Sequence, residues 1–290
     1  MDATILRNQP DRMAKGRPEK IVVAYDASPS AERALNAAIV IGRQFNSEIL
    51  IVQAISPDEA ASSSTGLRDE RTRDLNDIEE ARRRITKAGL SSRGIVRNGI
   101  VGDVVFSVCC EEHADLLVLG AYGYGLQDRP ALGSTAEYLL RSVPCPTLTF
   151  GPIVSADFDL VAHQGPILVP VSLPCGADQL QQAIVIAKLF SVKLEILHIA
   201  EHAIPTVIRD LESQCEQLIE RVRCGGANAQ WSFYIGAPDR IILQRAVESD
   251  SPFVLMPLRW GHRLSSVVSD NVAAHVIRSS TIPVMTYRVD

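Results

Sequence analysis

The sequence lacks the long hydrophobic run that a membrane-spanning helix requires. No uninterrupted apolar stretch approaches the roughly 18 residues of such a helix, so we expect a protein without a membrane partner. The residues before Ile21 are polar and include prolines, and they contain no hydrophobic segment of the kind found in secretory signals. We therefore expect a loose tail over residues 1–18 and a cytoplasmic protein.

An excess of positive charge is also missing. The formal net charge is −5 and the isoelectric point is near 5.7, whereas a nucleic-acid-binding protein needs a basic surface to neutralise phosphates. The six cysteines form no C-x-x-C pair, which argues against a disulfide scaffold and favours a reducing cytoplasm. No G-x-x-x-x-G-K-S/T motif is present, so the sequence excludes a P-loop enzyme.

The sequence does contain short apolar runs that alternate with amphipathic segments. Continuous runs such as IVVAY and EILIVQAI are typical of strands buried on both faces of a sheet. Between them, apolar residues recur every three or four positions, as on one face of a helix, and Ser28 or Ser30 can cap the first such segment. In the first half, these patterns predict strands over 21–25, 48–55, 93–98, 115–119 and 147–150, and helices over 28–45, 67–88, 102–113 and 134–142.

Strands that alternate with helices imply an α/β fold with a parallel, doubly wound sheet. The pattern recurs in the second half, where PILVPVS (166–172) matches KIVVAYD (20–26) and PFVLMP (252–257) matches DLLVLG (115–120). We therefore expect two tandem five-stranded domains, each with the strand order 3-2-1-4-5. The expected organisation is a tail over 1–18, a domain over 19–151, a linker over 152–164 and a domain over 165–290.

One group of glycines and an acid gathers where such a sheet binds ligands. Ligands lie at the carboxyl ends of strands where the strand order reverses, which here is between the first and fourth strands. The first strand ends in Asp26, and the fourth leads into the motif G-x2-G-x9-G-S, formed by Gly120, Gly123, Gly133 and Ser134. Glycines let backbone N–H groups approach a phosphate, and a helix N-terminus attracts anions. The pattern predicts a phosphate site, beside which Asp26 binds a ribose hydroxyl, a ring amine or phosphate-bound Mg²⁺.

A purely structural interpretation of these residues stays open. Glycines after a strand often serve tight turns, and Ser134 can cap the following helix while Glu137 completes a capping box. The run GAYGYG also differs from the dinucleotide-binding fingerprint, because it reads G-x-x-G-x-G and follows the fourth strand instead of the first.

Three segments resemble the universal stress protein family, namely IVVAYDASPSAERAL (21–35), LLVLGAYGYG (116–125) and GSTAEYLLRSVPCPTLTF (133–150). The chain resembles a tandem protein of this family from residue 19 to residue 288, and its glycine spacing resembles that of the ATP-binding branch. The resemblance also implies that the two domains pair through their fifth strands as an intrachain pseudo-dimer. That pairing covers two otherwise exposed sheet edges, and a homodimer of whole chains is compatible with it.

The same resemblance implies ATP as the ligand and identifies its binding residues. It assigns the glycines, Ser134 and Thr135 to the ribose and phosphates, and Asp26 and the backbone of Ala54 to the adenine side. The full implied set is Ala24, Tyr25, Asp26, Ala54, Gly120, Gly123, Gly133, Ser134 and Thr135.

The second repeat departs from this pattern at each corresponding position. Pro257 and Trp260 replace the first two glycines, Asp270-Asn271 replaces the Gly-Ser pair, and Ser172 replaces the acid at the strand end. Proline removes a backbone donor, tryptophan blocks a close approach, and a carboxylate at a helix start repels phosphate. We therefore expect one nucleotide per chain, bound in the N-terminal domain.

These patterns favour a cytoplasmic stress-response protein in which bound ATP regulates the choice of an unidentified protein partner. The first alternative is a slow ATPase or a nucleotide-using enzyme of a related α/β class, although the sequence contains no H-E-x-x-H motif or nucleophile elbow. The second alternative is a nucleotide-free scaffold in which the glycines serve the fold alone.

Overall fold

The structure of the protein is a computed structural model that describes residues 17–55, 66–123, 132–173, 175, 177–200, 205–259 and 268–289. The chain divides into two compact units, Pro18–Pro152 and Ile153–Asp290. Within the described residues, each unit contains five strands, and the paired strands of a unit run parallel.

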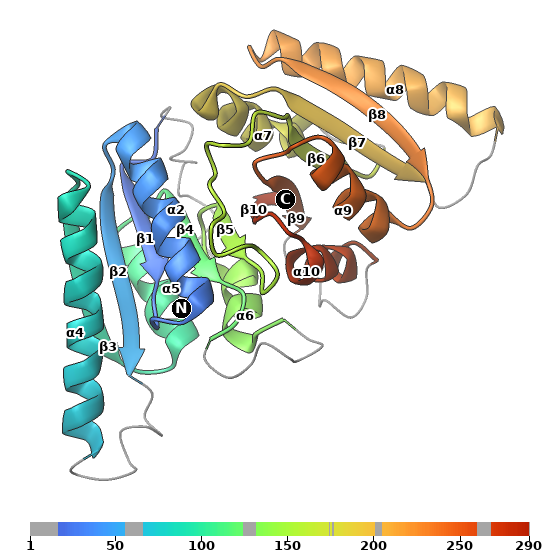
Figure 1. Ribbon diagram of the computed structural model, residues 1–290. Coiled ribbons are helices and arrows are strands. Elements are labelled where there is room, and N and C mark those ends of the chain that lie inside the picture. Colours follow the sequence, from blue (N-terminus) through green and yellow to red (C-terminus); the bar gives the residue numbers. More distant parts are fainter. Residues whose placement is uncertain are drawn as a thin grey trace. The chain divides into compact units, whose positions relative to one another are not determined.

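The first unit is a doubly wound sheet with helices on both faces (Figure 1). Its strand order is β3-β2-β1-β4-β5, which confirms the predicted α/β fold and the predicted order 3-2-1-4-5. The described elements are β1 (Lys20–Ala24), α2 (Pro29–Phe45), β2 (Glu48–Ile55), α4 (Gly66–Lys87), β3 (Ser92–Asn98), α5 (Val101–Glu111), β4 (Leu116–Gly120), α6 (Ser134–Ser142) and β5 (Thr147–Phe150).

Apolar content decides which strands lie in the middle of this sheet. The central strands β1 and β4 are buried along nearly their whole length, as continuous apolar runs require when helices cover both faces. Every residue of β3 is half-exposed or exposed, and this strand lies at the edge of the sheet. The more polar sequence of this strand therefore predicts its edge position correctly.

Helix α2 shows how local sequence fixes the first crossover. Ser28 is the N-cap, its side-chain oxygen accepts the N–H of Ala31 at 3.3 Å, and Pro29 follows at the first helical position. Asn46 ends the helix in the left-handed conformation, with φ of +56°. The predicted cap is thus Ser28, whereas Ser30 is buried within the first turn.

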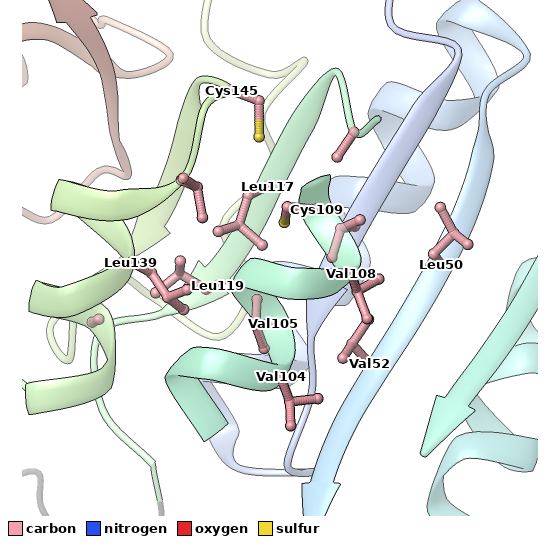
Figure 2. Packing of buried hydrophobic residues seen from close by; sticks show 14 residues of the cluster. Leu50, Val52, Val104, Val105, Val108, Cys109, Leu117, Leu119, Leu139 and Cys145 are labelled. Atoms are coloured by element: carbon pink, nitrogen blue, oxygen red, sulfur yellow. The ribbon is translucent and has the colours of Figure 1, made fainter. Parts of the chain in front are cut away.

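A cluster of buried side chains fills the space between the sheet and helices α5 and α6 (Figure 2). Alternate residues of the strands, such as Leu50 and Val52, pack against Val105 and Val108 of α5. Cys109 belongs to this cluster, and its contact with the Cys145 thiol, followed by burial, raises the pKa of the Cys109 thiol. Cys109 is therefore a core residue.

The second unit repeats the same topology. Its strand order is β10-β9-β6-β7-β8, which corresponds element by element to β5-β4-β1-β2-β3 of the first unit. Its described elements are β6 (Ile167–Val171), α7 (Ala177–Phe190), β7 (Leu194–Ala200), α8 (Pro205–Cys224), β8 (Ala229–Ile235), α9 (Pro238–Glu248), β9 (Val254–Arg259), α10 (Val268–Ser279) and β10 (Val284–Val289).

Backbone conformation follows the repeat at individual turns. Positive φ angles occur at corresponding positions of the two units, including the residue that ends the first helix of each. The corresponding pairs are Asn46 and Ser191, Gly89 and Gly226, Gly99 and Gly236, and His113 and Asp250. The turns of both units therefore demand the same left-handed geometry, whichever residue supplies it.

The two cores differ at one pair of corresponding positions. In the first unit, Leu50 of β2 and Val108 of α5 are both fully buried in the apolar cluster. In the second unit, Glu195 of β7 and Arg245 of α9 stand at these positions, and Arg245 Nη2 lies 2.9 Å from Glu195 Oε1. Glu195 is only 1% exposed and also accepts a hydrogen bond from Ser232. A buried ion pair thus replaces an apolar contact.

Candidate functional site

The point where strand order reverses lies between β1 and β4. β1 pairs with β2 on one side and with β4 on the other, and the chain adds β2 and β3 in one direction and β4 and β5 in the other. The carboxyl ends of β1 and β4 are therefore neighbours, which is the geometry that binds ligands in doubly wound folds. The predicted residues after both strands fall at this edge.

Asp26 follows β1 and is exposed at this edge. Its Oδ1 atom accepts the backbone N–H of Ser28 at 3.0 Å, which forms an Asx turn. Ala27, between them, has a φ of +57°, a conformation that alanine rarely adopts. The turn therefore holds the Asp26 carboxylate in place while leaving its second oxygen available.

Gly123 lies directly beside this carboxylate. A Cβ atom added at Gly123 would lie 2.8 Å from Asp26 Oδ2, closer than real Cβ contacts. The main chain that leaves β4 therefore passes the acid with no side chain between them. Backbone and carboxylate are therefore neighbours at this edge, and their contact with a nucleotide stays a prediction.

Gly120 has a different geometry, because the first turn of α2 lies on top of it. A Cβ atom at this position would overlap Ser30 Oγ and lie 3.0 Å from the Ser30 backbone carbon. Glycine is required here for close packing of helix against strand. A direct contact of Gly120 with a nucleotide remains a prediction.

Gly133 begins α6 and is tied to the end of β4. Its N–H donates to the Ala121 carbonyl at 3.2 Å, and an added Cβ would lie 2.7 Å from that oxygen. Gly133 is the N-cap, with φ of −57° and ψ of 134°. The alternative that Ser134 caps the helix is therefore wrong, and Glu137 pairs with Arg141 at 2.6 Å.

The donors that α6 offers to an anion come from the residues after Gly133. Ser134 and Thr135 are the first helical residues, and their N–H groups have no carbonyl one turn earlier in the helix. Ser134 is exposed and Thr135 is half-buried. The helix start therefore presents two amides, a hydroxyl and the positive end of the helix dipole.

An apolar wall borders the acid on the α5 side of the sheet. Ala24 of β1 and Ala54 of β2 are half-buried and pack against the core cluster, as does Leu132 before α6. The two alanines follow Val22 and Val52 by two residues, so they share the same face of the sheet. This wall is a suitable surface for a flat, apolar ring.

Tyr25 points away from this wall, because successive strand residues alternate in direction. Its buried hydroxyl donates to the Glu32 carboxylate, and Glu32 also binds Arg84 at 2.5 Å. Burial, followed by the hydrogen bond to Glu32, strongly raises the pKa of Tyr25. Only the backbone of Tyr25 lies near the predicted site, and its N–H donates to the Val52 carbonyl at 2.9 Å.

Among the described residues, no cluster of three or more His, Cys, Asp or Glu side chains is arranged to hold a metal ion. Asp26 therefore offers one carboxylate, and any Mg²⁺ there needs phosphate oxygens as further ligands. Within the same described part of the chain, no helix combines the length and apolar character needed to cross a membrane.

The second unit differs at the corresponding edge. Pro257 continues β9 and pairs with Tyr287, as Gly120 pairs with Phe150 in the first unit. The strand then runs on to Arg259, beyond the point where β4 has already ended. α10 begins at Val268, whereas α6 begins at Ser134. Trp260 and the side chains of Asp270 and Asn271 lie outside the described residues.

One contact at the site was not anticipated from the sequence. Ser30 Oγ donates to the Tyr122 carbonyl at 2.6 Å, and so links the first turn of α2 to the segment after β4. Sequence patterns identify Ser30 only as a possible helix cap, since its partner lies 92 residues away. The small residue at Gly120, which leaves room for this approach, is the one signal for it in the sequence.

Comparison with known proteins identifies a relationship for the first unit. The model of the universal stress protein family matches residues 18–150. A curated Thermus aquaticus protein, "Universal stress protein in QAH/OAS sulfhydrylase 3'region", is 26% identical over 134 residues, which are 44% of this chain and 95% of that protein.

Solved structures extend the likeness in fold to the whole chain. A universal stress protein from Archaeoglobus fulgidus DSM 4304 has a TM-score of 0.73 at 17% identity and covers 93% of this chain and 98% of its own. A universal stress protein solved in complex with cAMP is 28% identical, with a TM-score of 0.37, and covers 47% of this chain and 98% of its own.

Proposed function

We propose that the first unit, whose residues 18–150 match the model of the universal stress protein family, binds an adenine nucleotide, ATP, between the carboxyl ends of β1 and β4. The observation that carries this proposal is the approach of Gly123 to Asp26, where a Cβ atom would lie 2.8 Å from Oδ2. Bare main chain thus lies beside an acid at the reversal point of the strand order.

The parts of a nucleotide match the surfaces around this point. The start of α6 supplies the amides of Ser134 and Thr135 for phosphate oxygens. The free oxygen of Asp26 suits a ribose hydroxyl, or a Mg²⁺ ion held by the phosphates. The wall formed by Ala24 and Ala54 suits the adenine ring. Gly120 and Gly133 act through the backbone by keeping β4, α2 and α6 close together.

Binding without rapid turnover fits these groups best. Asp26 is the carboxylate that the described residues place at the site, and its Oδ1 is already engaged with the Ser28 N–H. We propose that ATP acts as a signal that orders the surface around α6 for a protein partner in a stress response. The six cysteines form no disulfide bond, which suits the reducing cytoplasm that we propose as the compartment.

We further propose that the second unit is a repeat of the same domain that has lost the nucleotide site. Both units share one strand order, and four pairs of corresponding turn residues have positive φ. β9 continues through Pro257 to Arg259, where the first unit turns away from its sheet. Leu258 and Arg259 are therefore strand residues at the positions that Ala121 and Tyr122 occupy after β4 in the first unit.

The test is direct measurement of nucleotide binding by the full chain. Isothermal titration with ATP, with and without Mg²⁺, is expected to give saturable binding in the wild type. Gly123→Val places a side chain against Asp26 and is expected to abolish binding. Gly89→Val, which strains a turn with φ of +81°, is the control for a loss of stability that leaves binding intact. Absence of binding in the wild type, or unchanged binding in Gly123→Val, would contradict the proposal.

A further inference from the structure

Ser30 is a buried residue beside the site, and it is not among the residues predicted to bind the nucleotide. Ser30 is 3% exposed, and its Oγ donates to the Tyr122 carbonyl at 2.6 Å. It also lies 3.2 Å from Ser28 Oγ. These contacts join the start of α2, which follows Asp26, to the segment after β4 that contains Gly123.

The direction of these hydrogen bonds follows from the groups involved. A hydroxyl has one hydrogen, and a carbonyl can only accept. Ser30 therefore donates its single hydroxyl hydrogen to the Tyr122 carbonyl. Ser28 must therefore donate in its contact with Ser30. Ser28 Oγ in turn accepts the N–H of Ala31. One continuous chain of hydrogen bonds runs from the start of α2 to the end of β4.

The same chain reaches the acid. Ser28 donates its backbone N–H to Asp26 Oδ1 at 3.0 Å, while its hydroxyl donates to Ser30. Asp26 and the Tyr122 carbonyl are thus held from one short segment of α2. Gly123, which follows Tyr122, is the residue whose α-carbon faces Asp26 Oδ2.

Packing at Gly120 enforces the arrangement from the other side. A Cβ atom there would lie 2.7 Å from Ser30 Cβ and 3.0 Å from the Ser30 backbone carbon. The end of β4 and the first turn of α2 therefore touch at the backbone. The hydrogen bond then fixes how the chain leaves the strand.

The second repeat shows that the fold does not require these hydroxyls. β6 and α7 form the same strand-to-helix unit, but the sequence between them is SLPCG. A one-residue gap in that stretch aligns Ser28 with Leu173 or Pro174, and Ser30 with Cys175 or Gly176. Neither alignment supplies a hydroxyl. The pair of serines is therefore absent from the same repeat that lacks the glycines.

We propose that Ser30 is a positioning residue for the nucleotide site, which sets the path of Tyr122 and Gly123 against Asp26. This inference rests on the proposed function of that site for its effect on affinity. Without the Ser30 hydroxyl, the buried Tyr122 carbonyl lacks this donor and the turn drifts from the acid. Ser30 acts through the backbone of the turn and needs no contact with the ligand.

The experiment compares Ser30→Ala with Ser47→Ala in the full chain. Ser47 is equally buried, and its Oγ donates to the Pro18 carbonyl at 2.6 Å near the opposite ends of the strands. The two variants lose the same kind of hydrogen bond, so similar losses of thermal stability are expected. Only Ser30→Ala is expected to weaken ATP binding, by about tenfold, and Ser30→Thr, which keeps a hydroxyl, is expected to recover most of it.

Hydrogen exchange separates this inference from the proposed function. Ser30→Ala is expected to speed exchange of the amides of Ala121, Tyr122 and Gly123, whereas Ser47→Ala leaves them unchanged. If the wild type binds no ATP but these amides respond, the proposed function fails and the positioning role stands. Unchanged exchange in Ser30→Ala, or equal loss of ATP affinity in Ser47→Ala, would overturn the inference.

Discussion

At the scale of single residues, the glycines of this site divide by what their missing side chains permit. Gly120 allows a helix to touch a strand, Gly133 allows α6 to begin against the Ala121 carbonyl, and Gly123 leaves open surface beside Asp26. Two of the three therefore serve assembly of the site. Glycines of a motif that predicts ligand contacts can thus be required mainly for close packing of the backbone.

Replacing Gly120 tests this division. Gly120→Ala is expected to lower the free energy of unfolding by about 1–3 kcal/mol, because its Cβ meets the Ser30 backbone, which cannot move alone. Gly102→Ala is the matched control, since its Cβ would lie 2.6 Å from the half-exposed ring of Tyr138, which can swing away. Urea denaturation measures both, and equal stability of the two variants would argue against the packing role.

Glu112 provides a pH-dependent contribution at the other end of the sheet. Hydrogen bonds from Arg93 and Lys20 lower the pKa of Glu112 to about 2, compared with roughly 4.3 in an unfolded chain. Because the folded pKa is depressed, this contribution is complete above about pH 4.3 and is lost as the pH falls toward 2.

The expected outcome is a flatter acid limb in Glu112→Gln. Urea denaturation between about pH 2.5 and 6 is expected to show wild-type stability falling more steeply than that of the variant. At neutral pH the variant is expected to be less stable, because Arg93 has lost one of its two charged partners, Glu112, and keeps Glu48. Parallel curves for the two proteins would show that Glu112 does not contribute in this way.

At the scale of elements, the residue that ends the first helix of each unit is left-handed, but only the first unit has a residue type there that suits this conformation. The first helix of the first unit ends at Asn46, which tolerates this conformation, but the corresponding residue of the second unit is Ser191 with φ of +56°. Ser191→Gly is therefore expected to stabilise the chain by about 0.5–1 kcal/mol.

Ser249→Gly is the control for this substitution. Ser249 also follows a helix, but its φ is −87°, and its hydroxyl donates to the Arg245 carbonyl at 2.7 Å. Glycine there adds freedom to the unfolded chain without relieving strain. Thermal unfolding is expected to show a gain for Ser191→Gly alone, and a gain in both variants would indicate a cause other than backbone conformation.

The ion pair between Glu195 of β7 and Arg245 of α9 leads to a second prediction at the scale of elements. Glu195→Leu leaves the Arg245 guanidinium without its buried partner and is expected to cost about 3 kcal/mol. Adding Arg245→Val reproduces the Leu50 and Val108 pair of the first unit and is expected to recover most of that loss. Urea denaturation of the single and double variants measures the coupling, and a double variant no more stable than Glu195→Leu would refute it.

Regular periodicity explains why the sequence predicts most elements correctly. The ranges of β2, β5 and α6 match the predicted 48–55, 147–150 and 134–142, because local patterns and caps fix them. The bond from Ser30 to Tyr122 could not be predicted, since it joins segments 92 residues apart. The direction of Tyr25 follows from strand alternation, yet its inclusion with the site came from the family resemblance alone.

At the scale of the whole molecule, two units with one topology carry different surfaces at the corresponding edge. We expect one ATP per chain, because β4 ends in a glycine turn whereas β9 continues to Arg259. Native mass spectrometry of the full chain counts bound nucleotides directly. Two nucleotides per chain would contradict the loss of the second site.

Ligand binding should also raise the stability of the folded protein. At an ATP concentration of 100 times Kd, linkage predicts a gain of about 2.7 kcal/mol for one site. Gly123→Val is expected to show no such gain in a thermal shift measurement. An equal shift in that variant would locate binding elsewhere in the chain.

The unlike cores bear on how a chain with two similar halves reaches its native state. If a nascent chain inserted β7 into the sheet beside β1, the Glu195 carboxylate would face Val108 with no cation to meet it. If α9 docked on the first sheet, Arg245 would be stranded against Leu50 in the same way. Each mispairing buries a charge without its partner. The ion pair therefore disfavours the insertion of elements of one unit into the core of the other.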